Sequence, residues 1–193
     1  MIIGITGGSG SGKTTLLSAI EATGGLVLDC DRIYHRLLET DASLLAAIAA
    51  RFPGTVEGGS LQRKKLGQLV FSDADALADL NAITHSAVKA EVERLLATAP
   101  ALVAIDAIGL FEGGLAPLCQ VTVAVTAPLE ARIARLTARD GISRDYALSR
   151  IRAQHEDSWF SSRCSHTLVN DGTIEEFHGK CLAFLSSIGI MDS

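Results

Sequence analysis

Short apolar runs alternate with stretches of helical periodicity along this chain. Each run is continuous in apolar or β-branched residues, which is typical of a strand buried on both faces of a parallel sheet. Strands that alternate with helices indicate an α/β fold, so we predict a five-stranded parallel sheet flanked by helices. The predicted strands are Ile2–Thr6, Leu26–Asp29, Leu102–Asp106, Val121–Thr126 and, with a weaker pattern, Thr167–Val169.

Two intervals are longer than a crossover between neighbouring strands requires. In residues 32–100, apolar side chains recur every three or four positions, which predicts helices with turns at Pro53-Gly54 and Gly58-Gly59. In residues 135–165, Ser143 is a favourable N-cap for a helix that runs to Gln154. We expect one domain over residues 1–193, with a helical substrate-binding subdomain at 32–100 and an arginine-rich lid at 135–165. The helices predicted in the first interval are Ser43–Phe52, Arg63–Phe71, Ala74–Ile83 and Ala87–Ala97.

Residues 7–14 read GGSGSGKT and fit the phosphate-loop motif G-x-x-x-x-G-K-[ST]. The loop lies between the first predicted strand and a predicted helix, where its N–H groups can bind phosphate at the positive end of the helix dipole. Lys13 is expected to reach the β and γ phosphates, and the Thr14 hydroxyl to ligate Mg²⁺. The alternative, a flexible Gly/Ser loop with a chance lysine, does not explain why the motif lies directly between a predicted strand and a predicted helix. The expected nucleotide-binding residues here are Gly8, Ser9, Gly10, Ser11, Gly12, Lys13, Thr14 and Thr15.

Two acidic residues, Asp29 and Asp31, lie at the end of the second predicted strand. Ligands of open parallel sheets gather beyond the carboxyl ends of the strands, so we expect both acids on the edge that carries the phosphate loop. The two side chains would point the same way if the extended backbone continued. We predict that Asp31 accepts a proton from an attacking hydroxyl, while Asp29 supports the loop or the water shell of the metal. The alternative is that one of them caps a helix that begins near Arg32.

Three arginines, Arg132, Arg135 and Arg139, share one face of a helix predicted after the fourth strand. Phosphoryl transfer requires positive charge around the moving group, and guanidinium groups match phosphate oxygens in bidentate geometry. A solvated helix face is the alternative for each arginine taken alone. We choose Arg139 as the catalytic arginine, because it lies at the junction with Asp140-Gly141.

Other motifs separate classes of nucleotide-binding protein. Asp106-Ala107-Ile108-Gly109 matches the D-x-x-G pattern of GTPases, but the sequence has no N-K-x-D motif for guanine. After the last strand, Asn170 can present its amide to adenine, although an ordinary turn would have the same sequence. The histidines have no metal-ligand spacing.

Composition narrows the class further. The chain is 48% hydrophobic and 20% charged, which is ordinary for a globular protein, and its net charge of −5 argues against a broad nucleic-acid surface. Its four cysteines form no C-x-x-C pair. We find no secretory signal and no apolar run long enough to span a membrane. We expect a cytoplasmic protein that binds a small anionic ligand, and the sequence predicts no oligomeric state.

The chain resembles the dephospho-CoA kinase family over nearly its whole length. The resemblance rests on the order and spacing of several short motifs. These are Thr6-Gly7-Gly8 with the phosphate loop, Asp29-x-Asp31, Leu61-x-Arg63-x-x-Leu66, Val70-Phe71, Leu80-Asn81-x-Ile83-x-His85, Leu110-Phe111-Glu112, Arg135-x-x-x-Arg139-Asp140, Gln154 and Asn170-Asp171-Gly172.

This resemblance implies a P-loop kinase fold and transfer of the ATP γ-phosphate to the ribose 3′-hydroxyl of dephospho-CoA, giving ADP and coenzyme A. It implies Asp31 as catalytic base and a coenzyme A subdomain in the helical insertion. It also implies acceptor-binding roles for His85, Leu110 and Glu112. The chain departs from the family pattern at His35, Ser86, Ile108, Gly109 and Ser165, which concerns contacts with the acceptor rather than the reaction.

Two other functions fit parts of the sequence. The phosphate loop alone would suit a uridine or nucleotide kinase equally well. A non-catalytic nucleotide-binding regulator would also contain it, but the presence of Lys13, Thr14, Asp31 and Arg139 in one chain favours an enzyme.

Overall fold

A computed structural model describes residues 1–190, which fold as two compact units. Of the described residues, the sheet unit contains 1–28, 99–110 and 116–190. The helical unit contains residues 29–98 and 111–115. Among residues 1–190, no helix combines the length and the apolar character needed to cross a bilayer.

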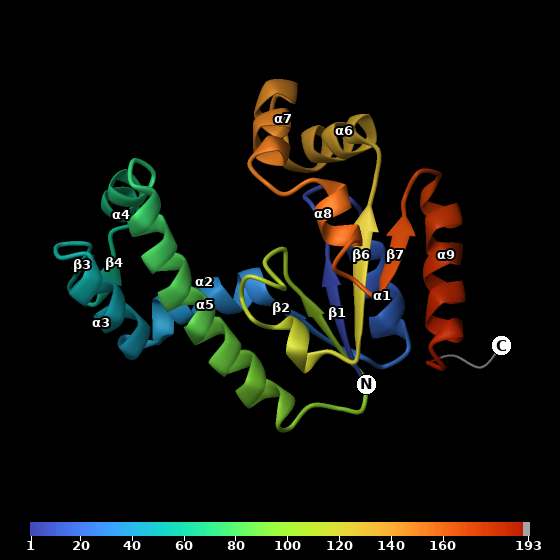
Figure 1. Cartoon of the computed structure of the whole chain (residues 1–193), viewed down its shortest axis with the longest axis horizontal. Coiled ribbons are helices and arrows are strands. Elements are labelled where there is room, and N and C mark those ends of the chain that lie inside the picture. Colours follow the sequence, from blue (N-terminus) through green and yellow to red (C-terminus); the bar gives the residue numbers. More distant parts are fainter. Residues whose placement is uncertain (191–193) are drawn as a thin grey trace. The chain divides into compact units, whose positions relative to one another are not determined.

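The sheet is parallel and has β1 (Ile2–Thr6) at its centre (Figure 1). Within residues 1–190 it has five strands in the order β2-β5-β1-β6-β7. β1 pairs in parallel with β5 and β6, and β6 pairs in parallel with β7. The predicted α/β sheet is therefore confirmed. The other strands are β2 (Leu26–Asp29), β5 (Val103–Asp106), β6 (Val121–Thr126) and β7 (His166–Val169).

Two helices, α1 (Lys13–Ala22) and α9 (Ile174–Ser187), pack against each other in the sheet unit. The core contains Ile3 and Ile5 of β1, Leu16 of α1 and Phe177 of α9, all at most 1% exposed. Burial of such side chains contributes roughly 1.5–3 kcal/mol each, so this core stabilises the packing of β1, α1 and α9 against one another.

Helices α6 (Leu129–Asp140) and α7 (Arg144–Arg152) form a smaller cluster in the same unit. Leu136 of α6 and Ala147 of α7 are fully buried in it. The Ser143 hydroxyl accepts a hydrogen bond from the Tyr146 N–H at 3.2 Å, which confirms Ser143 as the N-cap of α7. The unit also contains a 3₁₀ turn at Ala116–Leu118 and the short helix α8 (Asp157–Ser161).

The helical unit is organised around its longest helix, α5 (Ala74–Leu96), which packs on α2, α3 and α4. Our prediction of two helices in this stretch was wrong, because the chain continues helical through Thr84. The Thr84 hydroxyl donates to the Leu80 carbonyl at 2.9 Å, one turn earlier, and no Gly or Pro interrupts the segment. The other helices are α2 (Cys30–Thr40), α3 (Ala42–Arg51) and α4 (Arg63–Val70).

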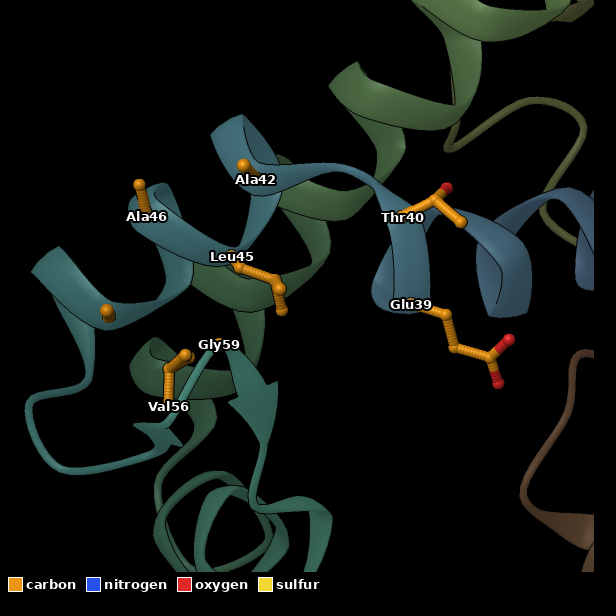
Figure 2. A pocket seen from close by; sticks show the side chains of 8 residues that line it. Glu39, Thr40, Ala42, Leu45, Ala46, Val56 and Gly59 are labelled. Atoms are coloured by element: carbon orange, nitrogen blue, oxygen red, sulfur yellow. The ribbon is translucent and has the colours of Figure 1, made fainter.

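A small antiparallel hairpin, β3 (Val56–Glu57) with β4 (Ser60–Leu61), completes the helical unit. Gly58 and Gly59 form its turn with φ of +58° and +77°, as the Gly-Gly pair predicts. Beside the hairpin lies an open hollow of about 340 Å³ (Figure 2). None of the predicted acceptor residues lines it. Its lining residues are Glu39, Thr40, Ala42, Leu45, Ala46, Ala49, Val56 and Gly59.

Candidate active site

The phosphate loop connects the end of β1 to the start of α1, as the motif requires. Gly12 is the N-cap residue of α1 and has φ +102°, a conformation that glycine adopts without steric cost. A Cβ at Gly12 would lie 2.1 Å from Nδ2 of Asn170. Because the first N–H groups of a helix have no partner within it, this loop presents N–H donors that suit phosphate oxygens.

Side chains outside the loop bind its carbonyl oxygens. Nε of Arg132 donates to the Ser9 carbonyl at 2.9 Å. Nη1 of Arg135 donates to the Gly10 and Ser11 carbonyls at 3.2 and 3.3 Å, and Nδ2 of Asn170 also donates to Ser11 at 2.9 Å. Three consecutive carbonyls are therefore held by cationic or amide donors of the sheet unit.

Ser9 is also held through its other polar groups. Its N–H donates to Oε1 of Gln154 at 2.8 Å, and its hydroxyl accepts from Nε2 of the same side chain at 2.7 Å. Ser9 is thus fixed by protein contacts, and its predicted contact with ATP stays a prediction.

Lys13 lies in the first turn of α1, and its Nζ donates to the Gly7 carbonyl at 2.8 Å. The amine thereby lies over the loop whose N–H groups are expected to bind phosphate. Thr14 follows it and is exposed, while Thr15 is partly buried. The roles that the motif predicts for these residues in binding ATP and the metal stay predictions.

The residues present fit a magnesium ion that is bound together with ATP. In residues 1–190, no group of three His, Cys, Asp or Glu side chains could hold a metal by itself. Mg²⁺ commonly takes only one or two protein ligands and completes its shell with substrate phosphates and water. Thr14 is exposed at the start of the helix that follows the loop, and its side chain carries a hydroxyl of the kind that such a shell requires; its role as a ligand stays a prediction.

The three arginines of α6 have different environments. Arg132 is 4% exposed and pairs with Asp157 at 3.0 Å, and burial lowers the pKa of its guanidinium, which still stays protonated. Arg135 donates to the loop and, at 3.0 Å, to Oδ1 of Asn170. The Arg139 side chain is 63% exposed and pairs with Asp140 at 2.7 Å.

The Arg139 pair has an electrostatic consequence for Asp140. The hydrogen bond from Arg139 lowers the pKa of the Asp140 carboxyl to about 2, and Arg150 contributes as well from 2.8 Å. In the described structure, Arg139 therefore belongs to a surface ion-pair cluster. Its catalytic role stays a prediction.

Asn170 is 5% exposed and directly follows β7. Its N–H donates to the Thr126 carbonyl at 2.8 Å, and its amide binds both Ser11 and Arg135. These contacts link the end of β7 to the phosphate loop. A contact with adenine stays a prediction for this residue.

The two acids at the end of β2, Asp29 and Asp31, take different positions in the helical unit. Asp29 caps α2, and its Oδ1 accepts from the Arg32 N–H at 2.9 Å, so the capping alternative holds for this residue. The condition for a common direction of the two acids is not met, because α2 begins at Cys30 and the extended backbone ends there. Asp31 is exposed in the first turn of α2, and its role as base stays a prediction.

The three predicted acceptor residues also lie in different places. His85 is half-buried on α5, and Glu112 is exposed in the segment 111–115 of the helical unit. Leu110 belongs to the sheet unit, where it is fully buried, and its Cδ2 lies 2.9 Å from the position of a Cβ on Gly4. In the described structure, Leu110 thus packs on β1, and the acceptor roles of all three residues stay predictions.

Sequence reasoning identified the arginine face of α6 but not the individual contacts. Arg132 and Arg139 lie four and three residues from the buried Leu136, so helical spacing places both near the packed side. It does not indicate which of them reaches the loop. Asp157 was missed, because neither a motif nor periodicity marks it.

The comparisons with known proteins bear on the whole chain. The family model described as dephospho-CoA kinase matches residues 1–176. The chain belongs to the dephospho-CoA kinase family. Among curated relatives, a dephospho-CoA kinase of Thermus thermophilus is 38% identical over 192 residues, covering 97% of this chain and 92% of that protein.

Solved structures share the fold of this chain. A crystal structure of a Thermus thermophilus protein has a TM-score of 0.81 at 36% identity and covers 97% of both chains. The dephospho-CoA kinase from Campylobacter jejuni has a TM-score of 0.67 at 22% identity, covering 97% of this chain and 96% of that one, and so supports the fold alone. The predicted family and P-loop kinase fold are therefore confirmed.

Proposed function

We propose that this protein transfers the γ-phosphate of ATP to the ribose 3′-hydroxyl of dephospho-CoA, giving ADP and coenzyme A. The observation that carries this proposal is the family match over residues 1–176, because it includes the helical unit as well as the phosphate loop. A shared phosphate loop alone would be compatible with any small-molecule kinase.

The residues divide the chemistry between them. The N–H groups of the phosphate loop and Lys13 bind the phosphates of ATP, and Thr14 contributes its hydroxyl to Mg²⁺. When bound, the metal neutralises charge on the β and γ phosphates. Arg139 would add positive charge during the transfer, provided that its side chain leaves Asp140.

Asp31 is proposed as the base for the acceptor hydroxyl. The 3′-oxygen forms a bond to the γ-phosphorus, the bond from that phosphorus to the bridging oxygen breaks, and ADP leaves. The hydroxyl proton moves to the Asp31 carboxylate. Exposure of Asp31 in the first turn of α2 supports this role, because its carboxylate is not used in capping the helix.

Three further residues are assigned to the acceptor, and the helical unit is proposed as the acceptor subdomain. His85 and Glu112 belong to that unit and Leu110 to the sheet unit. A net charge of −5 supports a small-molecule acceptor rather than a nucleic acid. We propose that the reaction takes place in the cytoplasm.

A panel of acceptors tests the proposed function. Purified protein with ATP and Mg²⁺ is given dephospho-CoA, uridine or a nucleoside monophosphate, and ADP release and product mass are measured. We expect turnover with dephospho-CoA and a product that co-elutes with coenzyme A. Turnover with uridine or the nucleotide, and none with dephospho-CoA, would overturn the proposal.

Substitution of Asp31 tests its role in the same assay. Asp31→Ala should lower kcat by about 10²–10⁴, the usual contribution of a positioned general base, while the Kd for ATP stays within about twofold. Lys13→Ala is the comparison, since it should weaken ATP binding as well as turnover. Wild-type turnover of Asp31→Ala would remove Asp31 from the chemistry.

A further inference from the structure

Arg132 contacts three consecutive residues of the phosphate loop. Its Nε donates to the Ser9 carbonyl at 2.9 Å. A Cβ on Gly8 would lie 2.1 Å from Nη2 of Arg132. A Cβ on Gly10 would lie 2.7 Å from the backbone oxygen of Arg132. The two glycines thus leave just enough room for Arg132 to lie against the loop backbone.

The second partner of Arg132 is Asp157, the first residue of α8. Nη1 of Arg132 donates to Oδ1 of Asp157 at 3.0 Å, and the two side chains are 5% and 31% exposed. Three residues before Asp157, Gln154 holds the N–H and the hydroxyl of Ser9. Arg132 and Gln154 therefore both hold Ser9, and Asp157 in turn holds Arg132.

The energetics of this pair favour a positioning role over a purely stabilising one. Buried ion pairs add little net stability, because desolvation of both charges offsets their attraction. Nη2 of Arg132 is buried and has no hydrogen-bond partner among residues 1–190, which adds a further cost. What the arrangement does provide is geometry, since a rigid guanidinium fork fixes the Ser9 carbonyl relative to α8.

We propose that Arg132 and Asp157 are positioning residues that hold the Ser9 carbonyl toward Arg132, so that N–H groups of the phosphate loop other than those of Ser9 and Ser11 face the phosphates of ATP. The proposal rests on the proposed function only in taking ATP as the phosphate donor. Neither residue needs to touch the nucleotide, because both act through Ser9.

The test compares three variants with wild type. Arg132→Gln removes the charge and the fork, Arg132→Lys keeps the charge without the fork, and Asp157→Asn weakens only the second contact. Arg51→Gln is the matched control, because Arg51 forms an exposed pair with Asp79 at 2.6 Å in the helical unit. The readouts are the Kd for ATP without acceptor, the KM for ATP and for dephospho-CoA, and the melting temperature.

Loss of a hydrogen bond from a charged group predicts a rise of about 10–100-fold in the Kd and KM for ATP in Arg132→Gln. The Kd and KM of Arg132→Lys for ATP should lie between those of Arg132→Gln and wild type, and Asp157→Asn should raise the Kd for ATP by roughly 3–10-fold. The KM for dephospho-CoA and all constants of Arg51→Gln should stay within about twofold of wild type.

Normal ATP affinity in folded Arg132→Lys and Asp157→Asn, with only a lower melting temperature, would overturn the positioning role. If Arg132→Gln does not fold, the Kd for ATP of these two milder variants tests the positioning role. The Kd for ATP also separates this proposal from the proposed function. If wild type binds ATP but does not phosphorylate dephospho-CoA, the proposed function fails, while weaker ATP binding in the variants would still support the positioning role.

Discussion

Substitution of Gly12 by alanine should disturb the phosphate loop through one identifiable collision. The added Cβ would lie 2.1 Å from Nδ2 of Asn170, at a residue with φ +102°. The backbone conformation alone costs an alanine about 1–2 kcal/mol. Displacement of Asn170 would also break its hydrogen bonds to Ser11 and to Arg135, at 2.9 and 3.0 Å.

Together, the strain and the lost bonds amount to about 3–6 kcal/mol, because a bond to a charged group contributes more than a neutral one. For a chain of this size, each kcal/mol lowers the melting temperature by roughly 2–4 °C. Gly24→Ala is the control, since Gly24 has φ +84° and, its two chain neighbours apart, no other residue of 1–190 has an atom within 4 Å of the added Cβ. It should incur only the conformational strain of about 1–2 kcal/mol.

Calorimetric unfolding and ATP titration measure both effects. We expect Gly12→Ala to have the lower melting temperature of the two and to lose ATP affinity, while Gly24→Ala binds ATP like wild type. In an Asn170→Ala background, the Gly12 substitution should lower the free energy of unfolding by less than it does in wild type, because the colliding amide is absent. Equal melting temperatures for the two single variants would refute the reasoning.

Two other predictions concern the helix cap and the thiols. Asp29→Ala should lower the free energy of unfolding by about 0.5–2 kcal/mol in urea titration through loss of the α2 cap, whereas Asp29→Asn, which keeps an acceptor, should stay near wild type; equal losses would contradict the capping role. Burial raises the pKa of Cys181 and of Cys119 to about 11, with Cys164 adding to the effect at Cys119. Only the thiolate reacts with iodoacetamide, and at pH 8 the thiolate fraction of a buried thiol is about 100-fold lower than that of an unshifted one. Iodoacetamide should therefore label both cysteines far more slowly in the native than in the urea-unfolded protein, and the native rate should rise as the pH approaches 11. Equal native and unfolded rates would contradict this.

The strands were the most predictable part of the fold. Continuous runs of apolar and β-branched residues such as Ile2–Thr6 and Val121–Thr126 predicted the observed bounds, because strands buried on both faces of a parallel sheet are rich in such residues. The hairpin β3–β4 was not predicted, since two-residue strands have no periodicity. We did not predict the bounds of helix α9 from the sequence, although Thr173 and Glu176 form a capping box that marks its start.

The candidate site was predictable where a local motif carries the chemistry. Lys13 and Thr14 follow from the spacing of the phosphate loop alone. The supports of that loop, Arg132, Gln154 and Asp157, come from distant parts of the chain and meet only through tertiary packing. Helical spacing placed Arg132 and Arg139 on one face, but only the folded structure separates a buried arginine from an exposed one.

The most direct test of the proposed reaction follows the transferred phosphate itself. The protein is incubated with Mg²⁺, dephospho-CoA and ATP labelled with ¹⁸O in its γ-phosphate, and the product is analysed by mass spectrometry and ³¹P NMR. The account predicts labelled coenzyme A with the phosphate on the ribose 3′-oxygen, in equal amount to ADP, and no product from the 3′-deoxy analogue. ADP formation without coenzyme A, or a label on any other position, would contradict it.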